Sequence, residues 1–341
     1  MSFASNAILA KAHSMYARRL GKSEYEELMR KTSMEDIFNY LKGVNGYSKV
    51  FNSHAHVSTR GELEVLYDEV LMTRLAQLIR YVSVKELPFF RVALMTIEER
   101  AILNKITSLN TGAPYTMAKV PRDIKKHGHI DFDQLERVTS YEELVDAMTD
   151  TPYELVLRLY TNAHGWDNVS KINRDLKRLY YETYINIATS KYRGQTRKDL
   201  LQIIETLIEL DNICRIYRLK KFFNVSPDDI RQVLYLDYSR IPLKKMDELI
   251  NAKNAETFLM MLADSEYKLY LDPKEFVFIE YYAEGIKYNL AKRFMRYSTQ
   301  PAVVYMTYVI LQTIELANLK HITEGVRYLE SQDKIEQLLI Y

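Results

Sequence analysis

Apolar residues recur every three or four positions over long stretches of this chain, which is the period of an amphipathic α-helix. From Leu200 the apolar positions step by three and four as far as Tyr217, and a second stripe runs parallel to the first. A face that broad can pack against more than one neighbour. Comparable patterns occupy 63–82, 172–188, 276–294 and 303–326. Because no alternating apolar pattern is sustained, the sequence predicts an all-α fold.

Turn-forming residues separate these predicted helices. Breaks rich in Gly, Pro and Asn fall at 110–114, 162–165 and 193–195. At Ser226-Pro227 the serine is typical of a helix N-cap, and the proline suits the first helical position.

A segment with the sequence features of an N-capped helix occurs three times along the chain. Each copy begins with a hydroxyl or amide side chain that can accept from the free N–H groups of a helix start. An acidic residue follows in the first turn, then apolar positions at helical spacing, and each copy ends at a tyrosine. The three copies are 32–47, 139–153 and 254–267, ending at Tyr47, Tyr153 and Tyr267.

A second repeated segment has a glutamate and an asparagine three residues apart. It occurs at 208–216 with Glu209 and Asn212, and again at 314–322 with Glu315 and Asn318. Weaker echoes lie at 97–102 and 6–9. Chance similarity among amphipathic helices is the alternative, but two segments recur in the same order.

The repeat period is close to a third of the 341 residues. Stacked solenoid repeats have periods of about 20–50 residues, so three small domains are the better interpretation. We expect similar helical domains at 1–95, 96–197 and 198–341, related by pseudo-threefold symmetry and sharing long helices at their junctions.

Composition is that of a soluble globular protein. With 47% hydrophobic and 27% charged residues, ten glycines and eight prolines, the chain can bury a core and favours helices. A single cysteine, Cys214, excludes a disulfide framework and fits a reducing compartment. The first residues lack the basic and apolar regions of a secretory signal, so we expect a cytoplasmic protein. A formal net charge of +2 gives no global attraction to nucleic acid or membrane.

One stretch, 297–314, contains no charged residue. A membrane span needs about 20 predominantly apolar residues. Polar residues interrupt this stretch and Glu315 ends it, so we expect a buried core helix rather than a transmembrane one. Any membrane association is then peripheral.

Candidate chemistry is sparse. The pairs His54/His56 and His127/His129 have a spacing that can chelate a metal from a loop, but no cysteine lies near them, and we interpret them as surface histidines. The sequence has no phosphate loop, no dinucleotide fingerprint, no Gly-x-Ser-x-Gly turn and no pair of Glu-x-x-His elements. It therefore predicts no catalytic residue, no metal, no cofactor and no direct nucleotide binding.

A basic run rich in tyrosine can be read in two ways. Its cations and rings are the groups that bind single-stranded nucleic acid, but Asp175 and Glu182 lie among them and a solvated helix face has the same composition. We favour the solvated face and expect no nucleic-acid partner. The run comprises Lys171, Arg174, Lys177, Arg178, Tyr180, Tyr181, Lys191, Tyr192, Arg193, Arg197 and Lys198.

Taken together, these segments resemble the C subunit of archaeal and bacterial V/A-type ATPases, which is related to the d subunit of the eukaryotic V-ATPase. The resemblance covers nearly the whole chain and is most specific in the closing helix. The chain departs from it in the tyrosine-rich region 180–198 and in the degenerate repeat at Ile97. The segments that carry it are 17–20, 24–28, 33–37, 209–218 and 315–325.

The resemblance implies a funnel of three helical domains in the central stalk of a rotary ATPase. Its base is expected to sit on the membrane ring of proteolipid subunits, at the cytoplasmic face, and its socket to receive the axle subunits of the catalytic head. Such a connector transmits rotation for ATP-coupled proton or sodium transport and hydrolyses nothing.

Contacts with these partners are hard to assign from the sequence. Exposed cations beside the repeat helices are candidates, although solvated helix faces look the same: Arg215, Arg218, Lys220 and Lys221. A generic helical scaffold of another complex and an enzyme with an unrecognised site remain as alternative functions.

Overall fold

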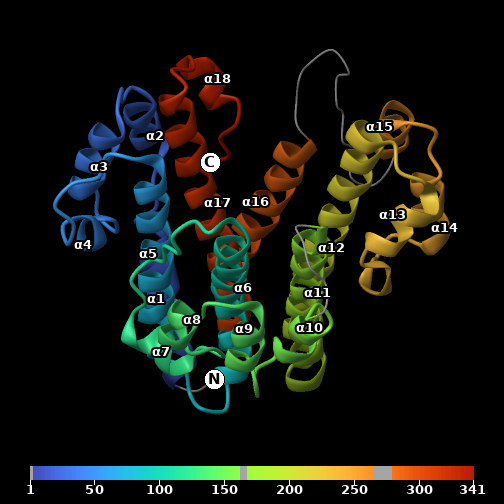
Figure 1. Cartoon of the computed structure of the whole chain (residues 1–341), viewed down its shortest axis with the longest axis horizontal. Helices are drawn as coiled ribbons and strands as arrows, with labels where there is room; N and C mark the ends of the chain where they lie inside the picture. The colour runs from blue at the N-terminus through green and yellow to red at the C-terminus, as the bar shows by residue number, and fades with distance from the viewer. Residues whose placement is uncertain (1–2, 162–166, 265–278) are drawn as a thin grey trace.

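Long helices arranged in three consecutive pairs dominate the computed structural model, which describes residues 3–161, 167–264 and 279–341 (Figure 1). Within these ranges every regular element is a helix, which confirms the predicted all-α class. A short connection joins the two members of each pair, and the members pack against each other. The pairs are α5 (Arg60–Ile79) with α6 (Leu87–Thr111), α11 (Asp167–Lys191) with α12 (Gly194–Arg218), and α16 (Ile279–Tyr297) with α17 (Pro301–Arg327).

These bounds agree with the sequence pattern. The predicted breaks at 110–114 and 193–195 coincide with the end of α6 and the start of α12, whereas 162–165 lies outside the described residues. At the first break Gly112 adopts a left-handed conformation, with φ of 69°, which favours glycine at a helix end. Ser226 caps the helix that begins at Pro227, as predicted.

Short helices form lobes beside the long pairs. The first lobe contains α2 (Lys22–Met29), α3 (Met34–Gly43) and α4 (Ser48–Phe51), and α1 (Phe3–Tyr16) precedes it. The middle lobe contains α7 (Arg122–His127), α8 (Phe132–Arg137), α9 (Tyr141–Ala147) and α10 (Glu154–Arg158). The last lobe contains α13 (Pro227–Val233), η2 (Leu236–Tyr238), α14 (Leu243–Ile250) and α15 (Ala255–Ala263), after a π-helical turn η1 (Leu219–Phe223). The helix α18 (Gln332–Glu336) follows α17.

The repeated capped segment forms a capped helix in all three lobes. The side chain of Ser33 accepts from Asp36 N, that of Ser140 from Glu143 N, and that of Asn254 from Thr257 N. These helices are α3, α9 and α15, so the prediction made for all three copies is confirmed.

We expect Asn254→Ala to lower the free energy of unfolding by about 1 kcal/mol, because the alanine leaves an N–H group at the start of α15 without its cap. Asn254→Ser keeps an acceptor at the cap and should remain within a few tenths of a kcal/mol of wild type. Urea unfolding of the two variants measures the difference. Equal losses in both would show that the cap contributes nothing.

Helix α17 is the core of the molecule. It contacts α1, α5, α6, α12 and α16. By length and composition it is the one described helix able to cross a membrane, but 83% of its most apolar window is buried inside the protein. The expectation of a buried core helix in this stretch is therefore confirmed.

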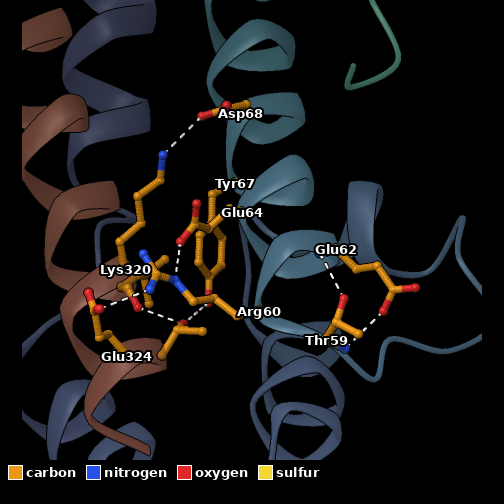
Figure 2. A network of polar contacts seen from close by, with 10 residues as sticks. Thr59, Arg60, Glu62, Glu64, Tyr67, Asp68, Lys320 and Glu324 are labelled. Carbon is orange, nitrogen blue, oxygen red and sulfur yellow. Dashed lines mark hydrogen bonds and ion pairs between the residues drawn. The ribbon is translucent and has the colours of Figure 1, made fainter. Parts of the chain in front are cut away.

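A polar network joins α5 to the far end of α17 (Figure 2). Arg60 of α5 bridges the two helices by binding Glu324 of α17 at 2.9 Å, and it also binds Glu64 of its own helix at 2.5 Å. The hydroxyls of Tyr67 and Thr323 lie 2.8 Å apart in the buried part of the same interface. These contacts fix α5 against α17, and the first lobe lies beside the two helices (Figure 1).

Candidate functional site

A buried glutamate lies on the second helix of every long pair: Glu98 on α6, Glu209 on α12 and Glu315 on α17. Their exposed fractions are 0%, 0% and 5%. A buried carboxylate is costly unless hydrogen-bond donors surround it, and each of these accepts from a lobe of short helices. We call each of these glutamates with its partners a glutamate hub.

The Glu315 hub joins α17 to the first lobe and to α5. The Tyr47 hydroxyl donates to Glu315 Oε1 at 2.5 Å, and Leu20 N donates to Oε2 at 3.1 Å. Arg74 of α5 donates to Oε1 at 2.9 Å and also contacts Gln312. The buried carboxylate thus binds two segments from the opposite end of the sequence.

Protonation in this hub follows from burial and from the charges nearby. Burial, reinforced by the Glu315 carboxylate, raises the pKa of Tyr47 well above its ordinary value. Burial alone lowers the pKa of Arg74, but Tyr47 and Glu315 outweigh it and raise that pKa. Arg74 is therefore a permanent cation, and Tyr47 remains a hydrogen-bond donor at neutral pH.

The Glu98 hub joins α6 to the middle lobe. The Tyr153 hydroxyl donates to Glu98 Oε2 at 2.5 Å, and His129 N donates to Oε1 at 2.7 Å. The His129 ring also places Nδ1 at 2.9 Å from Oε2. Burial and then the Glu98 charge raise the pKa of Tyr153 well above its ordinary value, so this hydroxyl stays protonated.

The prediction that His129 is a surface histidine is wrong. Its side chain is only 14% exposed, because the ring is held against Glu98 under the middle lobe. His54 fits the prediction better, with a side chain that is 38% exposed and 3.8 Å from Glu69. Among the described residues, no group of three or more His, Cys, Asp or Glu side chains is placed to hold a metal ion.

The Glu209 hub joins α12 to the last lobe. Backbone N–H groups of Arg240 and Ile241 donate to Glu209 Oε1, the second at 3.0 Å, and Arg240 Nη2 lies 2.9 Å from Oε2. Tyr267, the third repeated tyrosine, lies outside the described residues. The backbone part of this hub matches the contacts that Leu20 N and His129 N make in the other two.

The repeated asparagines also bind backbone. Asn212 accepts from Tyr235 N at 2.9 Å and donates to Tyr235 O at 3.1 Å. Asn318 makes the same pair of bonds to Ile340, at 3.0 Å and 2.7 Å. At the degenerate repeat Ala101 takes the asparagine position, so this clamp is missing beside Glu98. The sequence identified the Glu-x-x-Asn spacing but not its partners.

A polar hollow of about 600 Å³ lies between α11, α12 and α16. Burial alone raises the pKa of Asp211, but Lys177 and Lys287 outweigh it and hold that pKa below its ordinary value. Burial raises the pKa of the Cys214 thiol to about 12, so the thiol is protonated and a poor nucleophile at neutral pH. Glu99 also lines the hollow, and burial raises the pKa of its carboxyl above the ordinary value.

The four candidate cations do not form one cluster. Arg215 and Arg218 line the hollow, where Arg215 donates to Val233 O at 3.1 Å and Arg218 lies 3.7 Å from Glu280. Two others contact the last lobe: Lys220 donates to Ala252 O at 2.7 Å, and Lys221 donates to Glu256 at 3.1 Å.

Two of the three tyrosines of the basic run are packed inside the protein, whereas Tyr192 is half-buried. Tyr180 and Tyr181 are 8% and 3% exposed. The Tyr181 hydroxyl donates to Asp211, and the Tyr180 ring lies edge-on to Tyr184 with 5.1 Å between centroids. These two rings are therefore packed against neighbouring side chains and are not exposed for stacking with a ligand.

Comparison with known proteins identifies the family of this chain. The family model described as ATP synthase (C/AC39) subunit matches residues 8–338. The chain is similar to the C subunit of the A-type ATP synthase of Methanosphaera stadtmanae, with 22% identity over 93% of this chain and 83% of that protein. The corresponding protein of Methanococcoides burtonii is 25% identical over 56% of this chain and 53% of its own length. That of Methanosarcina mazei is 24% identical over 36% and 34%. The last two alignments thus span about half and about a third of those relatives.

Proposed function

This chain belongs to the ATP synthase (C/AC39) subunit family, as the C subunit of a V/A-type ATPase, and from that premise we propose that it is the connector of the central stalk. In this role it links the axle subunits of the soluble head to the membrane proteolipid ring. It is peripheral, at the cytoplasmic face, and transmits rotation for ATP-coupled proton or sodium transport. The observation that carries the proposal is the family match over nearly the whole chain.

The contacts between helices support a mechanical role. Torque passes through a body without loss only if its parts keep their positions relative to one another. The glutamate hubs tie each lobe to a long helix through buried hydrogen bonds, and such bonds are costly to break without replacement. Each lobe is thereby anchored to the long-helix frame.

The recurrence of the hubs also supports a pseudo-threefold funnel. The second helix of each long pair carries a glutamate that accepts a hydrogen bond from a backbone N–H group of a lobe. That N–H group lies either at the start of the lobe or in its middle. The domain divisions 1–95, 96–197 and 198–341 remain part of this proposal. In this division the first domain is completed by α17 from the end of the chain, because Glu315 binds Tyr47 and Leu20. A body with three similar faces would mediate between an asymmetric axle and a ring of equivalent subunits.

A helical scaffold of another complex is the alternative. Co-expression with the axle subunits and the proteolipid ring separates the two functions. The connector is expected to co-purify with both, and vesicles containing the complex without it should hydrolyse ATP yet pump no ions. A complex that pumps normally without this chain would contradict the connector function.

Arg218 and Lys221 provide a finer test of the axle contact. Both are exposed cations, with side chains that are 62% and 43% exposed. If they contact the axle, Arg218→Glu with Lys221→Glu should weaken its binding, whereas the same reversal at Lys22 and Arg30 on the first lobe should not. Unaltered assembly of the first variant would remove these residues from the interface.

A further inference from the structure

The three connections within the long pairs lie at one end of the molecule. Ser83, Lys191 and Gln300, one from the region of each connection, line the same hollow of about 420 Å³. Figure 1 shows the α5–α6 connection and the α11–α12 turn at the lower end of the molecule. We call this end the hairpin pole and define it as residues 80–88, 190–199 and 293–301.

The hairpin pole is strongly basic. It contains eight Lys and Arg against two Asp and Glu, a formal charge of +6, whereas the whole chain carries +2 and the remainder therefore −4. A charge separation of this kind directs one end of a protein towards an anionic partner. The cations are Arg80, Lys85, Lys191, Arg193, Arg197, Lys198, Arg293 and Arg296, and the acids are Glu86 and Asp199.

Most of these cations are available to a partner. Among the described residues, Arg80 alone of the eight forms an ion pair, to Asp123 at 2.5 Å. Arg193 donates only to backbone carbonyls, such as Thr189 O at 3.1 Å. Seven of the eight are thus not neutralised by a carboxylate of the described chain.

Helix dipoles do not account for this charge. Cations are favourable at the last turn of a helix, which suits Lys191 and Arg296 at the ends of α11 and α16. Arg197 and Lys198, however, lie at the beginning of α12, where the dipole disfavours cations. Helix stability alone therefore leaves part of the basic charge unexplained.

Exposed apolar and aromatic side chains lie among the cations. Val84 is 89% exposed, Tyr297 72% and Tyr81 44%. At or just after the C-terminal end of the first helix of each pair, a cation is followed by a tyrosine: Arg80-Tyr81, Lys191-Tyr192 and Arg296-Tyr297. Tyrosine is enriched at membrane interfaces because its ring is apolar and its hydroxyl group can hydrogen-bond with water.

We propose that the hairpin pole binds the anionic surface of a lipid bilayer. Its cations contact lipid phosphates, and Tyr81, Val84 and Tyr297 insert at the level of the headgroups. This inference rests on the proposed function, because it gives the connector a direct contact with lipid at the membrane. It also orients the molecule, with the lobes of α2–α4 and α18 directed away from the bilayer (Figure 1).

Sedimentation of the full chain with vesicles tests this contact. Wild type should bind vesicles of phosphatidylglycerol and phosphatidylcholine, bind pure phosphatidylcholine weakly, and dissociate as salt is added. Each neutralised cation should weaken binding roughly fivefold. The triple variant Lys85→Gln, Lys191→Gln, Arg296→Gln should therefore lose on the order of a hundredfold in affinity.

A matched triple variant loses the same charge on the first lobe and α18: Lys22→Gln, Arg30→Gln, Lys334→Gln. Its three side chains are 57% or more exposed, and it should bind the anionic vesicles like wild type. Equal losses in the two triples, or no binding by wild type, would overturn the proposal. So would a wild type that binds the isolated proteolipid ring but not the vesicles, an outcome that leaves the connector function standing.

Discussion

Replacing Glu315 with alanine is expected to lower the free energy of unfolding by about 3–5 kcal/mol, because it leaves the Arg74 charge buried without its partner. The side chains of Glu315 and Arg74 are 6% and 9% exposed. The substitution also removes the acceptor of Tyr47 and of Leu20 N, so two further donors lose a buried bond. Urea unfolding of the purified chain measures the loss.

Two controls separate the buried charge from other effects. In Arg74→Met with Glu315→Leu no unpaired charge remains, and apolar replacement of a buried ion pair is often close to neutral. This double variant should therefore be more stable than Glu315→Ala alone. Glu26→Ala breaks only the exposed Lys22–Glu26 pair, at 3.7 Å, and should cost no more than about 1 kcal/mol. A Glu315→Ala variant as stable as Glu26→Ala would show that the hub does not hold the first lobe.

The elements of the fold were predictable because their signals are local. The caps Ser33, Ser140 and Asn254 each accept from an N–H group three residues later, so the short sequence pattern contains both partners. Helix periodicity also repeats within a few turns, so the bounds of α17 and α12 follow closely from their apolar patterns.

The partners of the repeated residues were not predictable in this way. The sequence shows both repeated segments. It contains no local pattern that indicates a hydrogen bond between the tyrosine of the capped segment and the glutamate of the Glu-x-x-Asn segment. Tyr47 and Glu315 are 268 positions apart, whereas Tyr153 and Glu98 are 55 apart in the opposite order. The chain thus builds its first hub from its two ends. The His129 error has the same origin, because the partner that buries this ring lies 31 residues upstream.

The glutamate hubs and the hairpin pole occupy different parts of the long helices and have different roles. Near their connections the helices carry unpaired cations and exposed rings, which suit contact with another surface. Farther along, the same helices carry buried carboxylates that hold the lobes. A connector of this design would attach at one end, beside the middle lobe, and hold the first lobe at a distance from it (Figure 1).

Glu98→Ala is expected to lower the free energy of unfolding by about 3 kcal/mol, because it leaves one buried and one half-buried donor without an acceptor. These donors are the Tyr153 hydroxyl and His129 N, each of which now lies within 2.7 Å of the carboxylate. No asparagine clamp lies next to this hub, since Ala101 occupies the position of Asn212 and Asn318. The middle lobe should therefore depend on Glu98 more than the other lobes depend on their own glutamates.

Amide hydrogen exchange distinguishes a local effect from a global one. In Glu98→Ala, protection should fall first at His129 and through α8 to α10, while α3 of the first lobe stays protected. Glu98→Gln keeps the shape and one carbonyl acceptor for His129 N, so its loss of stability should be about 1 kcal/mol. Equal loss of protection in the first and middle lobes would contradict local anchoring. Selective opening of the middle lobe is the expected result, because the hub is a buried link between this lobe and α6.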